Sequence, residues 1–236
     1  MRKAKILAAL FVILCLSSCD EQGICLKGDG KVESRTVDLD RIDGVRVHGS
    51  TRVYVRKGDR QQIEVKGQPN ILNELGTSVD DGTWDIRFDR CLSHHETVEV
   101  YLTVPVLRSA KVNGSGYIKL EDKFRGREFD AAVSGSGDIQ GQIDTEMLNS
   151  DISGSGSIEL SGAAREQDIR ISGSGNHHAF NLKSRVASVR ISGSGKVQVY
   201  ASRELDVQIS GSGRVHYKGN PSTDIDVSGS GKVMKD

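Results

Sequence analysis

The chain has 236 residues with 32 basic and 32 acidic side chains, so its formal net charge is zero. A protein without excess positive charge has little affinity for nucleic acids or for anionic surfaces in general. Hydrophobic residues make up 36% of the chain, too many for a disordered protein, and glycine is abundant, with 27 copies. These values indicate a folded protein that does not bind nucleic acid.

The first residues have the pattern of a secretory signal. A basic stretch at residues 2–5 precedes the apolar run 6–16, which is too short to span a bilayer comfortably. The tetrapeptide Leu-Ser-Ser-Cys that ends at Cys19 resembles a lipobox, where cleavage occurs before a lipid-carrying cysteine. We therefore expect a signal peptide over residues 1–18 and a lipid anchor on Cys19. An ordinary secretory signal, with this cysteine incidental, is the alternative.

Two cysteines would remain free for pairing in the mature chain. Cys15 would leave with the signal peptide and Cys19 would carry lipid, which leaves Cys25 and Cys91. The cell envelope is an oxidising compartment, so these two residues are expected to form a disulfide. Two free thiols are the alternative, because sequence alone does not show that two cysteines lie close together.

A Gly-Ser-Gly motif occurs seven times in the C-terminal half, with 18 to 21 residues between successive copies. A nearly constant period of this length is typical of solenoids and repeat arrays. A flexible Gly/Ser linker would have neither a fixed period nor apolar flanks. The glycines of the seven motifs, which we expect to form structural corners, are Gly114, Gly116, Gly135, Gly137, Gly154, Gly156, Gly173, Gly175, Gly193, Gly195, Gly211, Gly213, Gly229 and Gly231.

The positions of the apolar residues around each motif indicate how the chain bends there. Val207, Ile209, Gly211, Gly213 and Val215 follow one another at every second position. Residues two apart in an extended strand share a face, so both glycines are predicted to face inward and the serine outward. Glycine suits a sharp corner with no room for an inward side chain. The pattern predicts an all-β solenoid; an array of antiparallel β-hairpins is the alternative.

The N-terminal half also has alternating apolar residues, although less regularly. The alternation predicts strands over 45–55, 63–65, 84–88 and 98–104, and only 70–75 has a helical pattern. Clusters of Gly, Pro, Asn and Asp separate these segments, as is typical of turns.

A degenerate first corner is predicted at residues 48–51, where Thr51 takes the place of the second glycine. Because the alternation of apolar residues runs through both halves of the chain, we expect a single solenoid domain over 32–236 after a tether over 19–31. A split into two domains near Pro105 is the alternative.

Several segments together resemble a known family. They are VRVHGSTRVYVRKGD at 45–59, IEVKG at 63–67 and VYLTVPVL at 100–107, between the lipobox and the repeats. This order is similar to the family called putative auto-transporter adhesin, head GIN domain, over nearly all of the mature chain. The resemblance implies a right-handed β-helix and a location in the cell envelope. It implies no catalytic residues.

The residues that could carry chemistry do not form a recognisable site in the sequence. Asp206, Asp224 and Asp226 could cluster, but exposed acidic residues usually belong to a solvated face. The histidine pairs 94–95 and 177–178 do not suit chelation, because neighbouring strand residues point to opposite faces. Cysteines and carboxylates at zinc-finger spacing from them are missing. The sequence therefore predicts neither catalytic residues nor a metal or other cofactor.

The functional hypothesis is a non-enzymatic lipoprotein of the cell envelope, anchored in the outer membrane, whose solenoid serves adhesion or another surface interaction. Its outer faces carry Ser, Gln, Lys and Asp side chains, which suit contact with a glycan or a protein. A carbohydrate-active β-helix enzyme is one alternative, and it would need carboxylates that converge at one place. A purely structural envelope protein is the other. The sequence identifies neither the ligand nor the oligomeric state.

Overall fold

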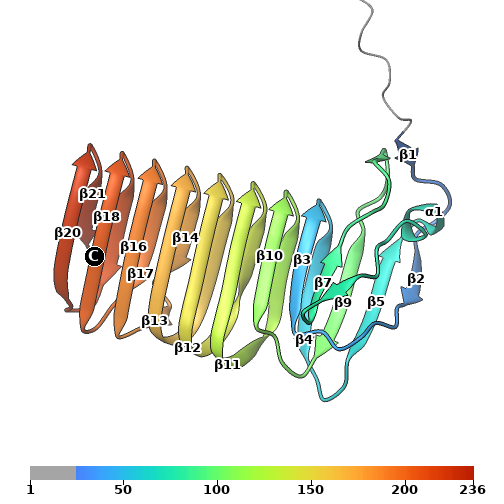
Figure 1. Ribbon diagram of the computed structural model, residues 1–236, viewed down its shortest axis with the longest axis horizontal. Helices are drawn as coiled ribbons and strands as arrows, with labels where there is room; N and C mark the ends of the chain where they lie inside the picture. The colour runs from blue at the N-terminus through green and yellow to red at the C-terminus, as the bar shows by residue number, and fades with distance from the viewer. Residues whose placement is uncertain (1–24) are drawn as a thin grey trace, which may run out of the picture.

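The protein is a β-solenoid in the computed structural model, which describes residues 25–236 (Figure 1). Each coil contains one strand before a corner and one strand after it, and both pair in parallel with their equivalents in the next coil. We call the sheet of strands before the corners face A and the sheet of strands after them face B. The parallel register confirms the predicted solenoid and excludes an array of antiparallel hairpins. The signal peptide and Cys19 lie outside the described residues.

Most coils are built from two separate strands. The face A strands are β7 (Thr83–Ile86), β3 (Gly44–Gly49), β10 (Ser109–Gly114), β16 (Val186–Gly193), β18 (Glu204–Gly211) and β20 (Ser222–Gly229). The face B strands are β9 (Glu99–Val104), β4 (Arg52–Lys57), β14 (Asn176–Ala179), β17 (Lys196–Tyr200), β19 (Arg214–Lys218) and β21 (Lys232–Lys235). Between them, β11 (Tyr117–Gly135), β12 (Asp138–Gly154) and β13 (Ser157–Gly173) start on face B, bend and end on face A, and β15 (Leu182–Lys183) pairs with β13.

The two glycines of each corner are required for different reasons. The first glycine has a positive φ, 123° at Gly193, and a Cβ there would lie only 2.5 Å from the carbonyl oxygen of Gly173 in the preceding coil. The second glycine faces the core, where a Cβ on Gly195 would lie 2.6 Å from Cγ2 of Ile171. The expectation that both glycines face inward therefore fits only the second, because the positive φ of the first interrupts the strand alternation.

The coil of β3 and β4 lies inside the stack and not at its end. β3 pairs with β10 on one side and β7 on the other, and β4 pairs in the same way with β11 and β9. The chain therefore builds this coil, returns to add β7 and β9 outside it, and then crosses over to β10. Gly49 is in register with Gly114, and Thr51 is buried where the second glycine of a motif would stand. The corner at residues 48–51 was predicted to be the first. It is the first along the chain, but its coil is not the first in the stack, because β7 and β9 lie outside it.

Antiparallel strands cover the N-terminal end of the stack. They are β5 (Gln62–Gly67), which pairs with β9, β2 (Glu33–Thr36), which pairs with β5, and β6 (Val79–Asp80), which pairs with β7. The helical turn α1 (Pro69–Leu72) matches the short helix that the sequence predicts. No helix within residues 25–236 is long and apolar enough to cross a membrane.

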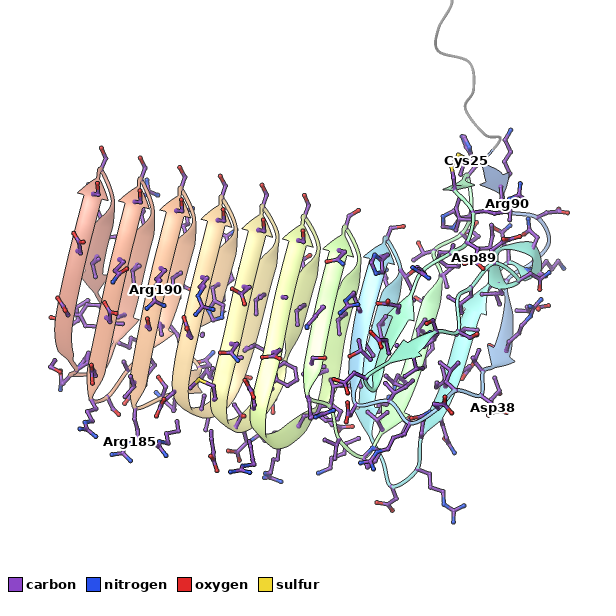
Figure 2. All side chains as sticks on the ribbon, viewed as in Figure 1. Cys25, Asp38, Asp89, Arg90, Arg185 and Arg190 are labelled. Carbon is purple, nitrogen blue, oxygen red and sulfur yellow. A yellow bond between two sulfur atoms is a disulfide. The ribbon has the colours of Figure 1, made fainter. Side chains whose placement is uncertain are left out.

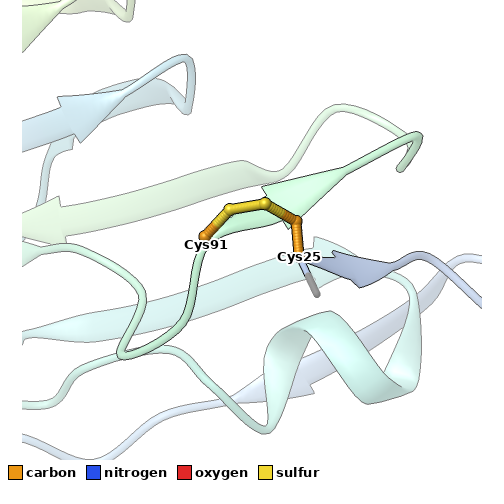
Figure 3. Close-up of a disulfide and its surroundings, with 2 residues drawn as sticks. All are labelled: Cys25 and Cys91. Carbon is orange, nitrogen blue, oxygen red and sulfur yellow. A yellow bond between two sulfur atoms is a disulfide. The ribbon is translucent and has the colours of Figure 1, made fainter. Parts of the chain in front are cut away.

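A disulfide joins the N-terminal segment to this end of the solenoid (Figure 3). It connects Cys25 with Cys91, whose Cα atoms are 4.7 Å apart. The two cysteines directly precede β1 (Leu26–Lys27) and β8 (Leu92–Ser93), which form a small parallel sheet of their own. The disulfide and the backbone hydrogen bonds between β1 and β8 together attach the first described residues to the solenoid.

The core between the two faces consists mainly of Val, Ile and Leu, and His177 is the one ionisable side chain buried among the described residues. His177 is completely buried, between Ile158 and Val197 of the neighbouring coils. Its Nε2 lies 3.1 Å from the hydroxyl of buried Ser150, and its Nδ1 has no hydrogen-bond partner among the described residues. Burial lowers the pKa of His177 to about 3, because the core disfavours the charged imidazolium. This imidazole is therefore neutral at physiological pH.

Candidate functional site: the outer faces of the solenoid

A groove of about 670 Å³ runs across face A along the axis of the stack. In-register parallel pairing creates it, because equivalent outward residues of successive coils form continuous rows. The first row consists of Lys111, Ala132, Asp151, Arg170, Arg190, Gln208 and Asp226. The second consists of Asn113, Ser134, Ser153, Ser172, Ser192, Ser210 and Ser228. The regular repeat therefore produces a groove that is longer than any single coil.

The charges in this groove compensate one another. Arg190, which Figure 2 labels on face A, has its Nη1 3.2 Å from Asp168 Oδ1. Arg170 contacts the other oxygen of the same carboxylate. Arg170 also approaches Asp151 at 3.7 Å. Such half-exposed pairs contribute little to stability, because water screens them. The groove thus offers alternating donors and acceptors without a strong field of either sign.

The three acidic residues considered in the sequence lie at the C-terminal end of face A. Asp206 of β18 and Asp224 of β20 are direct neighbours across the two strands, and Asp226 follows two residues later. Asp224 and Asp226 are exposed to solvent, and Asp206 is partly exposed. A pair of catalytic carboxylates has to flank the bond that it cleaves. These side chains instead project from one flat sheet, so they form a solvated acidic patch.

Of the two histidine pairs, only 177–178 lies on a strand, and its two side chains point to opposite faces as strand geometry predicts. His177 points into the core, whereas His178 is exposed, with its Nδ1 2.8 Å from Gln198 Oε1. His94 and His95 lie in the loop after β8, where His94 has a positive φ of 47°. Within residues 25–236, no three His, Cys, Asp or Glu side chains are grouped closely enough to hold a metal ion.

Face B carries a second groove, of about 820 Å³, which is more polar. Its borders include Gln140, Glu159 and His178 in one outward row and Ser161 and Asn181 in the next. It adds hydrogen-bonding side chains without converging carboxylates. Both faces are therefore surfaces for contact along the stack.

The sequence reasoning missed a cluster of three tyrosines at the N-terminal end of face B. The rings of Tyr54 and Tyr101 stack with their centroids 5.2 Å apart, and Tyr117 meets Tyr54 edge-on at 6.3 Å. The alternation of apolar residues could have predicted that Tyr54 and Tyr101 face outward, because each stands between two inward aliphatic residues. Three of the five tyrosines thus lie together at one end of this outer surface.

Hydrogen bonds and a cation hold these rings in place. The hydroxyl of Tyr101 donates to Glu99 and that of Tyr117 donates to Gln140, each at 2.8 Å. The bond to the Glu99 carboxylate, together with burial, raises the pKa of Tyr101 to about 12. Lys66 Nζ lies 4.4 Å above the Tyr101 ring, within the range of a cation–π interaction. The tyrosine cluster is therefore fixed before any ligand arrives.

A pocket of about 540 Å³ opens between this cluster and the corners. It is lined by Ser50, Arg52, Tyr54, Thr97, Ser115, Gly116, Tyr117 and Asp138. This pocket combines an aromatic wall with charged and hydroxyl-bearing side chains, so it offers a stacking surface beside hydrogen-bonding groups.

Three solved structures share this architecture. A putative adhesin from Bacteroides fragilis is 21% identical, with a TM-score of 0.84, and the match covers 89% of this chain and 99% of the other. A putative adhesin from Parabacteroides distasonis is 26% identical, with a TM-score of 0.74 and coverage of 89% and 99%. A putative lipid binding protein from the same species is 24% identical, with a TM-score of 0.76 and coverage of 89% and 98%. No curated protein matches the chain.

The family model described as putative auto-transporter adhesin, head GIN domain, matches residues 41–221. This range runs from just before β3 to the connection between β19 and β20, so it includes the face B groove, the tyrosine cluster, most of the corners and all of the face A groove except its last coil. The chain belongs to this family of head GIN domains.

Proposed function

We propose that the protein is a non-enzymatic lipoprotein of the cell envelope that uses its solenoid for adhesion or another surface interaction. A lipid on Cys19 would anchor it in the outer membrane. Residues 19–31 would form the tether and 32–236 a single solenoid domain. The adhesin family supports a surface role, and the ligand of that role would be a glycan or a protein.

The observation that carries this proposal is the groove across face A. Its borders are formed by residues of seven successive coils, from Lys111 to Asp226, on a sheet that is continuous in register. A site built on paired strands is held more rigidly than one built on loops. A long, rigid surface with compensated charges suits an extended partner better than it suits catalysis on a small substrate.

An array of printed glycans and surface proteins tests the proposal with the full chain in detergent. We expect saturable binding to at least one printed glycan or protein, without release of sugar from it. Release of reducing sugar from a bound glycan would support the alternative of a carbohydrate-active enzyme. Failure to bind any printed molecule would contradict the adhesion role and favour a purely structural protein.

The anchor gives a separate prediction. A Cys19→Ala variant should incorporate no labelled palmitate, because the cysteine that would receive the lipid is gone. The parent chain should be labelled and fractionate with membranes. A Cys25→Ala variant serves as the matched control and should be labelled like the parent. Label that persists in Cys19→Ala would exclude this residue as the lipid attachment site.

A further inference from the structure

The pocket beside the tyrosine cluster contains charged side chains that have no partner within the described part of the protein. Within residues 25–236, neither Arg52 nor Asp138 forms an ion pair or a side-chain hydrogen bond. On the two faces, four arginines do have such partners, namely Arg46, Arg56, Arg170 and Arg190. The hydroxyls of Ser50 and Ser115 at the corners are exposed as well. The pocket thus offers free donors and acceptors at one place.

The register of face B places these groups on both sides of one aromatic ring. Arg52 is the direct neighbour of Tyr117 in one adjacent coil, and Asp138 is its direct neighbour in the other. Neighbouring strands lie about 4.8 Å apart, so a donor and an acceptor flank the ring at about that spacing. Tyr54 closes one side, with its ring at 72° to that of Tyr117. The two tyrosine rings thus meet at a steep angle, with one cation and one anion beside them.

We propose that this pocket binds a neutral saccharide unit, which stacks on Tyr117 between Arg52 and Asp138. The C–H groups of a sugar ring carry partial positive charge and suit the negative face of an aromatic ring. Sugar hydroxyls both donate and accept, so they can accept from the guanidinium of Arg52 and donate to the carboxylate of Asp138. This inference rests on the proposed surface role and names the class of ligand for it.

The charges in the pocket distinguish a neutral sugar from a charged ligand. A phosphate or carboxylate could pair with Arg52, but it would also lie near the unpaired carboxylate of Asp138. A cationic ligand would meet the opposite difficulty at Arg52. A hydroxyl-rich neutral molecule satisfies both groups. The volume of about 540 Å³ also lies in the range of about 300–1,000 Å³ that is usual for small-ligand sites.

The test is a binding titration of the full chain in detergent against an array of neutral hexose and N-acetylhexosamine oligosaccharides, with acidic glycans and surface proteins printed beside them. We expect binding to at least one neutral glycan. Tyr117→Ala should weaken it at least about tenfold, because the stacking surface is lost. Arg52→Gln and Asp138→Asn should each weaken it by about tenfold, the effect of losing one charged hydrogen bond.

Two matched variants separate a role in binding from a role in folding. Tyr117→Phe keeps the ring and loses only the bond to Gln140, so binding should stay within about threefold of the parent. Tyr200→Ala removes another tyrosine of face B, whose ring lies under Lys183 and outside the pocket, so binding should not change. If Tyr117→Ala fails to fold, Arg52→Gln and Asp138→Asn still test the site, because neither side chain is buried in the core.

The outcomes for this site and for the surface role differ. Neutral-glycan binding that survives Tyr117→Ala, Arg52→Gln and Asp138→Asn would overturn the pocket as the site. Binding only to acidic glycans or only to printed proteins would also overturn it, while the proposed surface role would stand. Failure to bind any printed molecule would overturn both.

Discussion

Gly193→Val should destabilise the solenoid by about 2–6 kcal/mol. Gly193 has a φ of 123°, which a β-branched residue adopts only with strain of about 1–3 kcal/mol. The new Cβ would also lie 2.5 Å from the carbonyl oxygen of Gly173, so the two coils would have to separate locally. Overpacking of this kind costs a further 1–3 kcal/mol or so. Denaturant unfolding of the parent and the variant, followed by circular dichroism, measures the difference.

Ser194→Val provides the control at the same corner. Ser194 is exposed at the tip, between the two glycines, so the same substitution there should change stability by less than about 0.5 kcal/mol. A melting temperature of Gly193→Val equal to that of the parent would show that the corner does not need glycine at this position. Equal losses in both variants would instead indicate that valine disturbs the corner wherever it is placed.

The repeat was the part of the fold that could be predicted best from the sequence. Each coil has the same local pattern, so the strands and corners could be inferred from the period and the alternation alone. The role of the first glycine could not, because alternation describes which face a residue occupies and not its φ. Gly193 and Gly195 look equivalent in the sequence, yet one is required by its backbone and the other by its neighbour Ile171.

The order of the N-terminal coils depends on long-range contacts that local patterns do not encode. The segment containing β7 and β9 follows β3 and β4 along the chain, but it pairs on their far side. Both sides of β3 and β4 offer parallel partners of similar pattern, so alternation does not choose between them. The antiparallel strand β5 takes the outer edge of β9, which explains why this end does not accept a further repeat.

The candidate site was only partly predictable for a related reason. The outward rows of face A follow from the repeat, and Ser, Gln, Lys and Asp side chains were expected on the outer faces from the sequence. The tyrosine pocket depends on register between Arg52, Tyr117 and Asp138, which come from three segments far apart in the chain. Period and alternation show that each of them faces outward, but only strand pairing shows that they are neighbours.

The buried histidine should make the stability of the protein depend on pH. His177 has a pKa of about 3 in the folded state, compared with about 6.5 when unfolded. Between these values the unfolded chain binds a proton that the folded chain does not. The free energy of unfolding should therefore fall as the pH drops below about 6.5, by up to about 1.4 kcal/mol per pH unit, until about pH 3. Above pH 7 this contribution is constant.

Replacing His177 by valine should remove this part of the acid sensitivity. Valine fits the position, since Val197 occupies it in the next coil, but it would leave the buried hydroxyl of Ser150 without its partner. The double variant Ser150→Ala with His177→Val avoids that cost, because Ala131 is the equivalent of Ser150 in the preceding coil.

Urea unfolding at pH 7.5 and pH 4.5 compares the double variant with the parent and with His178→Gln. His178 is the exposed neighbour, so its substitution should leave the loss between the two pH values unchanged. The double variant should lose about 2–3 kcal/mol less than the parent, the amount that two pH units below 6.5 would supply. Carboxylates that titrate in this range are common to all three proteins and cancel in the comparison. An equal loss in all three would mean that the imidazole of His177 gains a proton inside the folded solenoid, and that its burial against Ser150 does not keep it neutral.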